Sequence, residues 1–206
     1  MLIKTFYSLD FPQNCYAVEN EDGIFLVDPG EYTEKLALYV KQNSSNIKYI
    51  LLTHLHFDHI RATAKIKNQC PNAKIVMHSL DANEVNNPQI NLAAYFGYQI
   101  DDISVDVCCE DLQIITTGAT NIRVMHTPGH TEGGVCYIVE DVIFSGDTLF
   151  EGSCGRTDFP GGDGNILLNS LKKLKYLDGD FKVYPGHGNP TTLSNEKVFN
   201  PYMRNL

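Results

Sequence analysis

Alternating and continuous apolar stretches predict that the chain begins as a β-sheet. Residues 1–8, 15–19 and 23–27 show strand patterns, and Asn20-Glu21-Asp22-Gly23 between the last two is typical of a hairpin turn. We therefore expect antiparallel strands first, followed by a helix at residues 34–42.

Strand and helix patterns then alternate along the chain. The apolar, β-branched run 47–52 predicts a buried strand, and the segments after it predict a helix at 60–69, a short strand at 74–77 and a helix at 79–84. An amphipathic segment follows Pro88, and residues 101–111 are acidic and less regular. The second half repeats the order of strands followed by helix, with the elements 113–116, 122–126, 134–139, 142–145, helix 165–177 and strand 181–184. This order favours the α/β class.

Length and composition bound the organisation of the protein. With 206 residues, 43% of them apolar, we expect one domain spanning residues 1–206 whose core is large enough for four layers. The net charge is −9, with 16 basic and 25 acidic residues and no basic run, which disfavours a nucleic-acid partner and favours a small-molecule substrate. The sequence contains no feature that specifies an oligomeric state.

The cysteines and the first residues indicate the compartment. The six cysteines show no C-x-x-C spacing, and Cys108 and Cys109 are adjacent, so we expect free thiols in a reducing environment. The opening segment lacks the pattern of a signal peptide, and no apolar run approaches the length of a membrane span. We therefore expect a soluble cytoplasmic protein with no membrane partner.

The segment Thr53–His59 concentrates three histidines and a carboxylate between a predicted strand and a predicted helix. Residues two apart on extended backbone point the same way, so His54 and His56 can share one metal ion. Asp58 and His59 follow as the chain turns into the helix, and they are aimed at a second point. Imidazole and carboxylate ligands suit zinc, iron or manganese, and the lack of a thiolate argues against a closed structural zinc site. Taken alone, the run is also compatible with a surface histidine cluster.

Three further candidate ligands follow predicted strands. His130 comes after strand 122–126, Asp147 after strand 142–145, and His187 after strand 181–184. A glycine beside each one allows close approach of the backbone. Together with the strand before His54, four strands thus deliver a candidate metal ligand at a strand-to-loop junction.

Five other polar residues are candidates for supporting roles. Two of them have both a functional and a structural interpretation, and for the other three we expect a structural role or a role near the site. Asp28 is either a turn aspartate or the acceptor that holds the outer ring nitrogen of a ligand histidine. Arg156 is either a substrate-binding residue or part of a structural salt bridge. His78 is expected to be structural or to lie at the surface, His126 to pack or to hydrogen-bond near the site, and Asp163 to cap a helix.

Four motifs, T-H-L-H-F-D-H, H-T-P-G-H-T, S-G-D-T-L-F and P-G-H-G, together resemble the metallo-β-lactamase superfamily over nearly the whole chain. The resemblance implies a four-layer αββα sandwich and two divalent metal ions, for which we expect zinc, with iron or manganese as alternatives. It also implies a catalytic role for Asp58, which would steer a hydroxide besides binding metal. The implied ligand sets are His54, His56 and His130 for one metal, Asp58, His59 and His187 for the other, and Asp147 as the bridge.

Within that superfamily, residues 146–150 and 154–158 resemble glyoxalase II-like hydrolases, also called hydroxyacylglutathione hydrolases. This resemblance implies hydrolysis of a small thioester by a metal-bridging hydroxide. Two-domain glyoxalase II enzymes bind glutathione through a C-terminal helical region, whereas only about twenty residues follow His187 here. The acyl group and the thiol carrier therefore stay open. Arg61 also departs from relatives, which often have a small residue there.

Three alternative functions remain. The string G-R-T-D-F also resembles the persulfide dioxygenases, in which a single Fe(II) would be held by His54, His130 and Asp147. A lactonase or β-lactamase is a second alternative, and the lack of an export signal weighs against a secreted β-lactamase. A non-catalytic metal-binding module is a third, but it predicts at least one broken ligand position, and none is broken.

Overall fold

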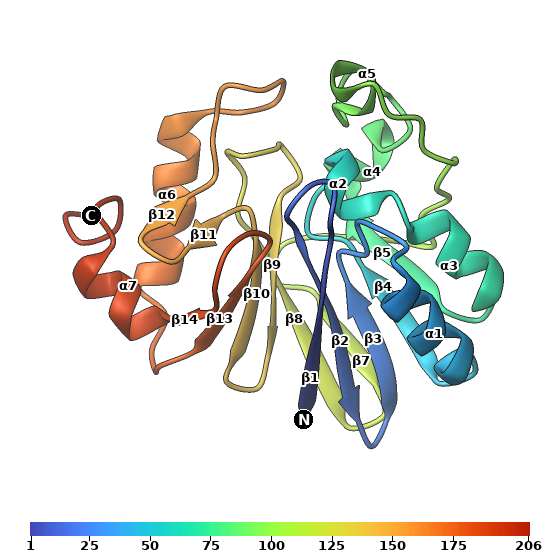
Figure 1. Ribbon diagram of the computed structural model, residues 1–206. Helices are drawn as coiled ribbons and strands as arrows, with labels where there is room; N and C mark the ends of the chain where they lie inside the picture. Colours follow the sequence, from blue (N-terminus) through green and yellow to red (C-terminus); the bar gives the residue numbers. More distant parts are fainter.

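The computed structural model describes all 206 residues as two β-sheets packed face to face, with helices on both outer sides (Figure 1). In the first sheet, β1, β2 and β3 are antiparallel neighbours, and β3 to β6 run parallel. Its strands, in spatial order, are β1 (Leu2–Tyr7), β2 (Asn14–Asn20), β3 (Gly23–Val27), β4 (Ile47–Leu51), β5 (Lys74–His78) and β6 (Val107–Cys109).

The second sheet is antiparallel except where β10 pairs with β13. Its strands, in spatial order, are β14 (Thr191–Thr192), β13 (Lys182–Pro185), β10 (Val142–Gly146), β9 (Val135–Val139), β8 (Thr120–His126) and β7 (Ile114–Thr117). A separate two-stranded ribbon consists of β11 (Leu149–Phe150) and β12 (Ser153–Cys154).

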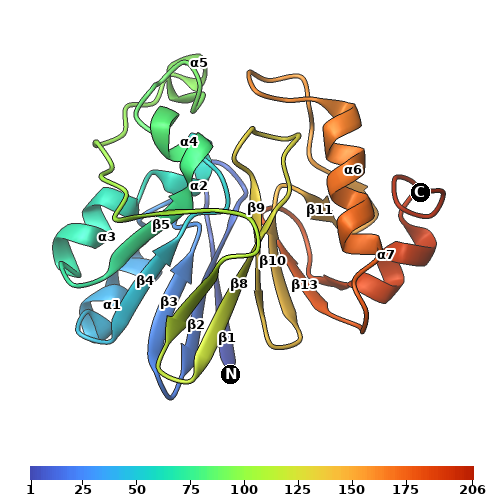
Figure 2. The ribbon, with the colours of Figure 1, turned by 180° about the vertical axis from the view of Figure 1, so that it is seen from behind.

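Three apolar clusters hold the layers together. One lies between the sheets and includes Phe25, Tyr137 and Phe144, a second joins the first sheet to its helices through Leu36, and a third joins the second sheet to its helices through Leu171. Figure 2 shows from behind that each sheet has its own helices on its outer side. The helices beside the first sheet are α1 (Glu34–Asn43), α2 (Phe57–Ile60), α3 (Thr63–Gln69), α4 (Ser79–Glu84) and α5 (Ala93–Phe96). The helices beside the second sheet are α6 (Gly164–Lys175) and α7 (Leu193–Phe199). The predicted αββα sandwich is confirmed.

Local signals explain where several elements begin and end. The Oγ1 atom of Thr33 accepts from the backbone N–H of Leu36 at 3.3 Å and caps α1. The predicted cap of α6 is confirmed, because Asp163 Oδ1 accepts from the N–H groups of Asn165 and Ile166 at 2.8 and 3.0 Å. None of the helices combines the length and apolar character needed to cross a membrane.

The prediction of a helix over residues 60–69 is confirmed for 63–69, where α3 lies, but its start is wrong, because a break separates α3 from the short helix α2 before it. At the break, the N–H of Ala62 donates to the carbonyl of Pro29 at 3.0 Å. This bond to the loop after β3 interrupts the helix. Asp58 and His59 consequently lie on a short helical turn of their own.

The prediction that residues 101–111 are irregular is wrong for three of them, which form the edge strand β6 beside β5. The carboxylate of Asp106 accepts from the N–H of Ile75 at 2.8 Å and fixes the approach of this strand. The short elements β11, β12, β14 and α7 were not predicted either. The three strands have only two residues each, which is too few to show an alternating pattern.

Candidate metal centre

The four strands β4, β8, β10 and β13 end close together, and each is followed by predicted metal ligands. Five of these ligand residues are buried, while Asp147 and His187 are partly exposed. The residues brought together are all seven that the motifs indicate, namely His54, His56, Asp58, His59, His130, Asp147 and His187.

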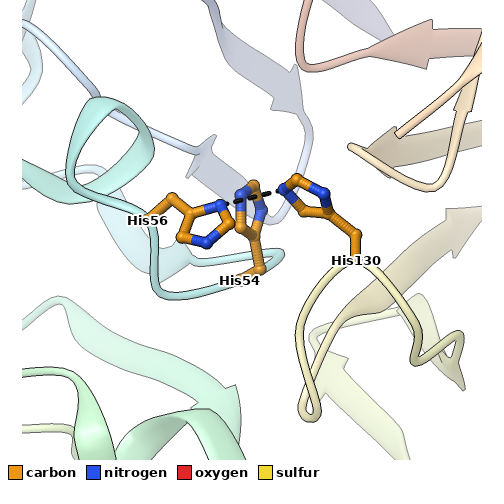
Figure 3. A group of neighbouring side chains, drawn as sticks. All are labelled: His54, His56 and His130. Carbon is orange, nitrogen blue, oxygen red and sulfur yellow. Dashed lines mark hydrogen bonds between the residues drawn. The ribbon is translucent and has the colours of Figure 1, made fainter. Parts of the chain in front are cut away.

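His54, His56 and His130 form the first ligand group (Figure 3). His56 Nδ1 faces His130 Nε2 at 2.9 Å, and the His54 ring centroid lies 4.8 Å from that of His56 and 4.9 Å from that of His130. One nitrogen of each ring lies within 4.8 Å of the others. Three imidazoles at this spacing can hold one cation.

Asp58, His59 and His187 form the second ligand group. His187 Nε2 lies 3.3 Å from Asp58 Oδ2 and 3.3 Å from His59 Nε2. His59 Nε2 lies 3.7 Å from Asp58 Oδ2. This group offers two nitrogens and one oxygen to a second cation.

Asp147 reaches both groups with its two carboxylate oxygens. Oδ1 lies 3.4 Å from His59 Nε2 in the second group, and Oδ2 lies 3.4 Å from His130 Nε2 in the first. Oδ2 also lies 3.5 Å from His187 Nε2. A carboxylate in this position is suited to bridging two metal ions.

Backbone carbonyls fix the tautomers of two ligand histidines. The Nδ1 of His130 lies 2.7 Å from the carbonyl oxygen of Arg156, and the Nδ1 of His187 contacts the carbonyl oxygen of Pro12. A carbonyl oxygen can only accept, so Nδ1 carries the hydrogen in both rings. In the neutral rings, each Nε2 therefore presents its lone pair to the other ligands.

Asp28 supports one histidine of each group from outside. Its Oδ2 lies 2.9 Å from His59 Nδ1 and accepts from Thr53 Oγ1 at 2.6 Å, and Thr53 Oγ1 in turn lies 3.1 Å from His54 Nδ1. Its Oδ1 accepts from the N–H of Thr53 at 2.7 Å. Asp28, His54 and His59 also lie close enough together to hold a metal ion. Both oxygens of Asp28 already accept hydrogen bonds, however, so we interpret Asp28 as a residue that orients the ligand histidines and does not bind metal itself.

The pKa shifts show where positive charge is favoured. Burial, followed by the neighbouring imidazoles, lowers the pKa of His54 and His56 well below the ordinary value, so both stay neutral. Burial also lowers the pKa of His59, but the carboxylates of Asp147, Asp58 and Asp28 outweigh it and raise this pKa to about 10. Three carboxylates around one imidazole thus attract positive charge, which protons or metal cations can provide.

Two buried polar atoms of the ligand groups, His54 Nε2 and Asp147 Oδ1, have no hydrogen-bond partner within the protein. Buried polar atoms without partners are uncommon in native proteins and call for an explanation such as an ion. The donors are nitrogen and oxygen without sulfur, which suits divalent zinc, iron or manganese. The residues therefore fit two divalent metal ions.

Asp81 is a supporting residue that the sequence analysis missed. It is buried on α4, and its Oδ2 accepts from the N–H of Leu55 at 3.0 Å and from Thr131 Oγ1 at 2.9 Å. Its Oδ1 accepts from the N–H of Gly133 at 2.6 Å. One carboxylate thus ties the loop of His54 and His56 to the loop of His130. An aspartate in the first turn after β5, at the same end of the sheet as the metal loop, was the available signal.

Two histidines predicted to lie outside the ligand sets form a separate pair. His78 and His126 stack with ring centroids 4.0 Å apart, and His126 Nε2 bonds to the carbonyl of Glu132. His78 is buried and its Nδ1 accepts from the N–H of Leu80 at 3.3 Å, which caps α4. Packing is therefore the role that the structure shows for both.

Two arginines lie beside the centre without contacting the ligands through their guanidinium groups. Arg156 donates from Nε and Nη2 to Asp158, both at 2.6 Å, and this exposed pair matches the salt-bridge interpretation. Its substrate-binding role stays a prediction. Arg61 donates to the carbonyl of Gly30 at 3.1 Å and stacks over Tyr98 at 4.7 Å, so it joins the loop after β3 to the segment after α5.

A four-layer αββα fold with two His/Asp ligand groups at its strand ends defines a class of metal-dependent hydrolases. The chain belongs to the metallo-beta-lactamase superfamily, whose family model matches residues 9–187.

Individual relatives extend this assignment. The chain is 32% identical to the hydroxyacylglutathione hydrolase GloC of Haemophilus influenzae, over 94% of this chain and 93% of that protein. The crystal structure of the B3 metallo-beta-lactamase BLEG-1 is similar with a TM-score of 0.91 and 33% identity, covering 98% of this chain and 99% of that one. The structure of TTHA1623 in a di-iron-bound form has a TM-score of 0.85 and 34% identity, covering 97% and 99%.

Proposed function

We propose that this protein is a dinuclear metal-dependent hydrolase of small-molecule thioesters, similar to hydroxyacylglutathione hydrolase. The observation that carries the proposal is the position of Asp147, whose two oxygens each lie 3.4 Å from a histidine of a different ligand group. A mononuclear site would need no carboxylate directed at both groups. The similarity to GloC supports a thioester as the substrate class.

Two divalent ions at this centre would act as Lewis acids on the carbonyl oxygen and would lower the pKa of a bound water. The protein contributes the arrangement of the reactants. Asp58 lies at the partly exposed side of the centre, where its Oδ2 can accept a hydrogen bond from the attacking water and orient it. A thiolate leaves readily because the pKa of a thiol is only about 8.5, so no separate general acid is required.

The nitrogen and oxygen donors lead us to propose zinc as the native metal, with iron or manganese as the alternatives. The di-iron-bound form of TTHA1623, 34% identical to this chain, makes iron the alternative to test first. The six cysteines are unpaired, which supports a reducing compartment, and we assign the protein to the cytoplasm on this basis.

The test is to purify the protein without oxygen, measure zinc, iron and manganese per chain, and assay the same sample for two reactions. These reactions are thioester hydrolysis and persulfide-dependent uptake of O2. We expect about two metals per chain, hydrolysis, and no uptake of O2. About one iron per chain with O2 uptake would contradict the proposal and favour the persulfide dioxygenase. Hydrolysis of lactones in preference to thioesters would favour a lactonase.

A further inference from the structure

Four aromatic side chains pack against one another beside the first ligand group. The ring centroids of Phe11 and Phe57 are 5.1 Å apart, those of Phe11 and Phe96 are 5.0 Å apart, and those of Phe96 and Phe159 are 6.3 Å apart. Phe159 lies 6.0 Å from the ring of His56. We name this set, Phe11, Phe57, Phe96 and Phe159, the aromatic arc. Its members come from the loop before β2, from α2, from α5 and from the loop after β12.

An aromatic ring also lies near the second ligand group. The ring of Phe150 lies 6.0 Å from that of His187, at 90°. Each group of candidate ligands therefore has an aromatic side chain close to one of its histidines.

Both the centre and several of the rings near it are partly exposed. The side chains of Asp58 and Asp147 are each 11% exposed and that of His187 is 30% exposed, whereas that of His59 is fully enclosed. Phe11, Phe96, Phe150 and Phe159 are themselves only half-buried. The exposed faces of Phe11, Phe96 and Phe159 are therefore the part of the arc that a substrate can contact, since the fourth ring, Phe57, is buried.

The positive charges beside the arc are already matched within the protein. The guanidinium of Arg156 lies 4.0 Å over the ring of Phe159, and the same group donates two hydrogen bonds to Asp158. This pair holds Phe159 in place and offers little net charge to a ligand.

Arg61, which lies over the ring of Phe57, also has carboxylates near it. Its Nη1 lies 3.8 Å from Asp10 and its Nη2 lies 3.9 Å from Glu31. Acidic side chains thus balance part of the charge of both guanidinium groups.

We propose that the aromatic arc binds an apolar, preferably aromatic, group attached to the scissile carbonyl. This inference rests on the proposed thioester hydrolysis and narrows its substrate class. A ring of the substrate can pack on the exposed faces of Phe11, Phe96 and Phe159 at centroid distances of about 4.5–7 Å, and burial of an apolar ring is favourable in itself. The group can belong to the acyl part or to the thiol part of the substrate.

The first experiment compares kcat/KM of the metal-loaded protein in two arms. The acyl arm uses phenylacetyl and lactoyl thioesters of the neutral thiol N-acetylcysteamine, and the thiol arm uses lactoyl thioesters of benzyl mercaptan and of glutathione. In one arm, we expect kcat/KM for the aromatic thioester to exceed that for the other thioester by about tenfold or more. Apolar pockets of other enzymes distinguish their substrates by factors of this size. The arm that shows this preference identifies the part of the substrate in the arc.

Variants test whether the arc causes the preference. We define the preference ratio as kcat/KM for the aromatic thioester divided by kcat/KM for the other thioester in the same arm. Phe159→Ala and Phe96→Ala should each reduce this ratio severalfold, through KM more than through kcat. Phe159→Leu, which retains an apolar side chain, should retain part of the ratio and guards against loss of folding. Phe199→Ala removes an aromatic side chain that is 70% exposed at the end of α7 and should leave the ratio unchanged.

A binding measurement separates this inference from the proposed function. Calorimetry with the carboxylates phenylacetate and lactate reports the preference of the arc without turnover. If thioesters are hydrolysed with no aromatic preference in either arm, the arc proposal is overturned and the function stands. If no thioester is hydrolysed but phenylacetate binds more tightly than lactate, and Phe159→Ala abolishes the difference, the arc proposal stands and thioester hydrolysis is overturned.

Discussion

The Oδ2 atom of Asp28 lies 2.9 Å from the Nδ1 atom of His59, and the backbone of Asp28 has a φ of 48°. Such a left-handed conformation costs about 1–3 kcal/mol for a residue other than glycine. The same carboxylate accepts from both the N–H and the Oγ1 of Thr53. These three hydrogen bonds offset the cost and connect β3 to the metal loop.

Asp28→Asn should reduce metal binding without disturbing the backbone, because asparagine tolerates positive φ. Its amide would offer a donor to His59 Nδ1 and favour the tautomer that carries hydrogen on Nε2. We expect metal content to fall from about two toward one per chain and activity to fall about 10- to 100-fold. Metal analysis together with a thioester assay checks this. The control is Asp163→Asn at the N-cap of α6, a position where asparagine can also accept the capping hydrogen bonds, and this variant should retain both metals. Normal metal content in Asp28→Asn would contradict the supporting role of Asp28.

Asp81 should make stability depend on pH in a specific direction. Burial raises the pKa of this carboxylate from 3.8 to about 6 in the folded state. The hydrogen bonds to the carboxylate lower the pKa but are outweighed, and the negative charge of Glu132 adds to the increase. The folded protein therefore keeps this proton to higher pH than the unfolded chain. The stabilisation is complete below about pH 4 and is lost as the pH rises through about 6, amounting to about 3 kcal/mol for this group.

Urea denaturation of the metal-free protein and of Asp81→Asn at pH 4 to 7 measures this effect. The free energy of unfolding of the wild type should decrease relative to that of the variant across this range. Asp158→Asn is the matched control, because the pKa of Asp158, held at about 2 by its hydrogen bond to Arg156, places its titration outside the range. Parallel pH profiles for wild type and Asp81→Asn would show that Asp81 is ionised throughout.

His56→Ala distinguishes a dinuclear hydrolase from a mononuclear dioxygenase. The change removes the nitrogen that faces His130 at 2.9 Å, so the hydrolase should lose metal from the first group and about 100-fold or more in activity. A dioxygenase that uses only His54, His130 and Asp147 should lose much less. The two assays on one preparation decide between them. The control is His126→Ala, which removes a ring stacked on His78 outside the centre and should keep the metals. Full activity of His56→Ala in both assays would contradict the assignment of His56 as a metal ligand.

Gly186→Ala should damage the centre by steric conflict. A Cβ atom at this position would lie 2.4 Å from Asp147 Oδ1 and 2.5 Å from His59 Cε1, both closer than van der Waals contact allows. We expect loss of metal and of most activity, measured by metal analysis and thioester hydrolysis. At Gly164 an added Cβ meets nothing closer than 3.5 Å, and Gly164→Ala should be nearly neutral in both measurements. Retention of two metals by Gly186→Ala would mean that the ligands can shift to accommodate a methyl group.

Prediction from sequence succeeded where the signal was local. The strands that precede His54, His130 and Asp147 are apolar runs that end at a turn, and the structure contains all three within a residue or two of the predicted bounds. It missed the start of the helix after the metal loop, because a hydrogen bond from Ala62 to Pro29, far away in the chain, separates α2 from α3. The very short strands failed for the same reason, since neighbouring strands rather than their own residues determine them.

By itself, the sequence determined the fold class and the seven candidate ligands, because histidine and aspartate at successive strand ends are recorded in the order of the residues. Only the tertiary structure decided how these ligands are supported and what surrounds them. Asp81 joins two ligand loops, and Phe11, Phe96 and Phe159 meet across three segments that are distant in the chain. Contacts of this kind depend on how the two sheets and their loops pack, and no periodicity along the chain encodes that packing.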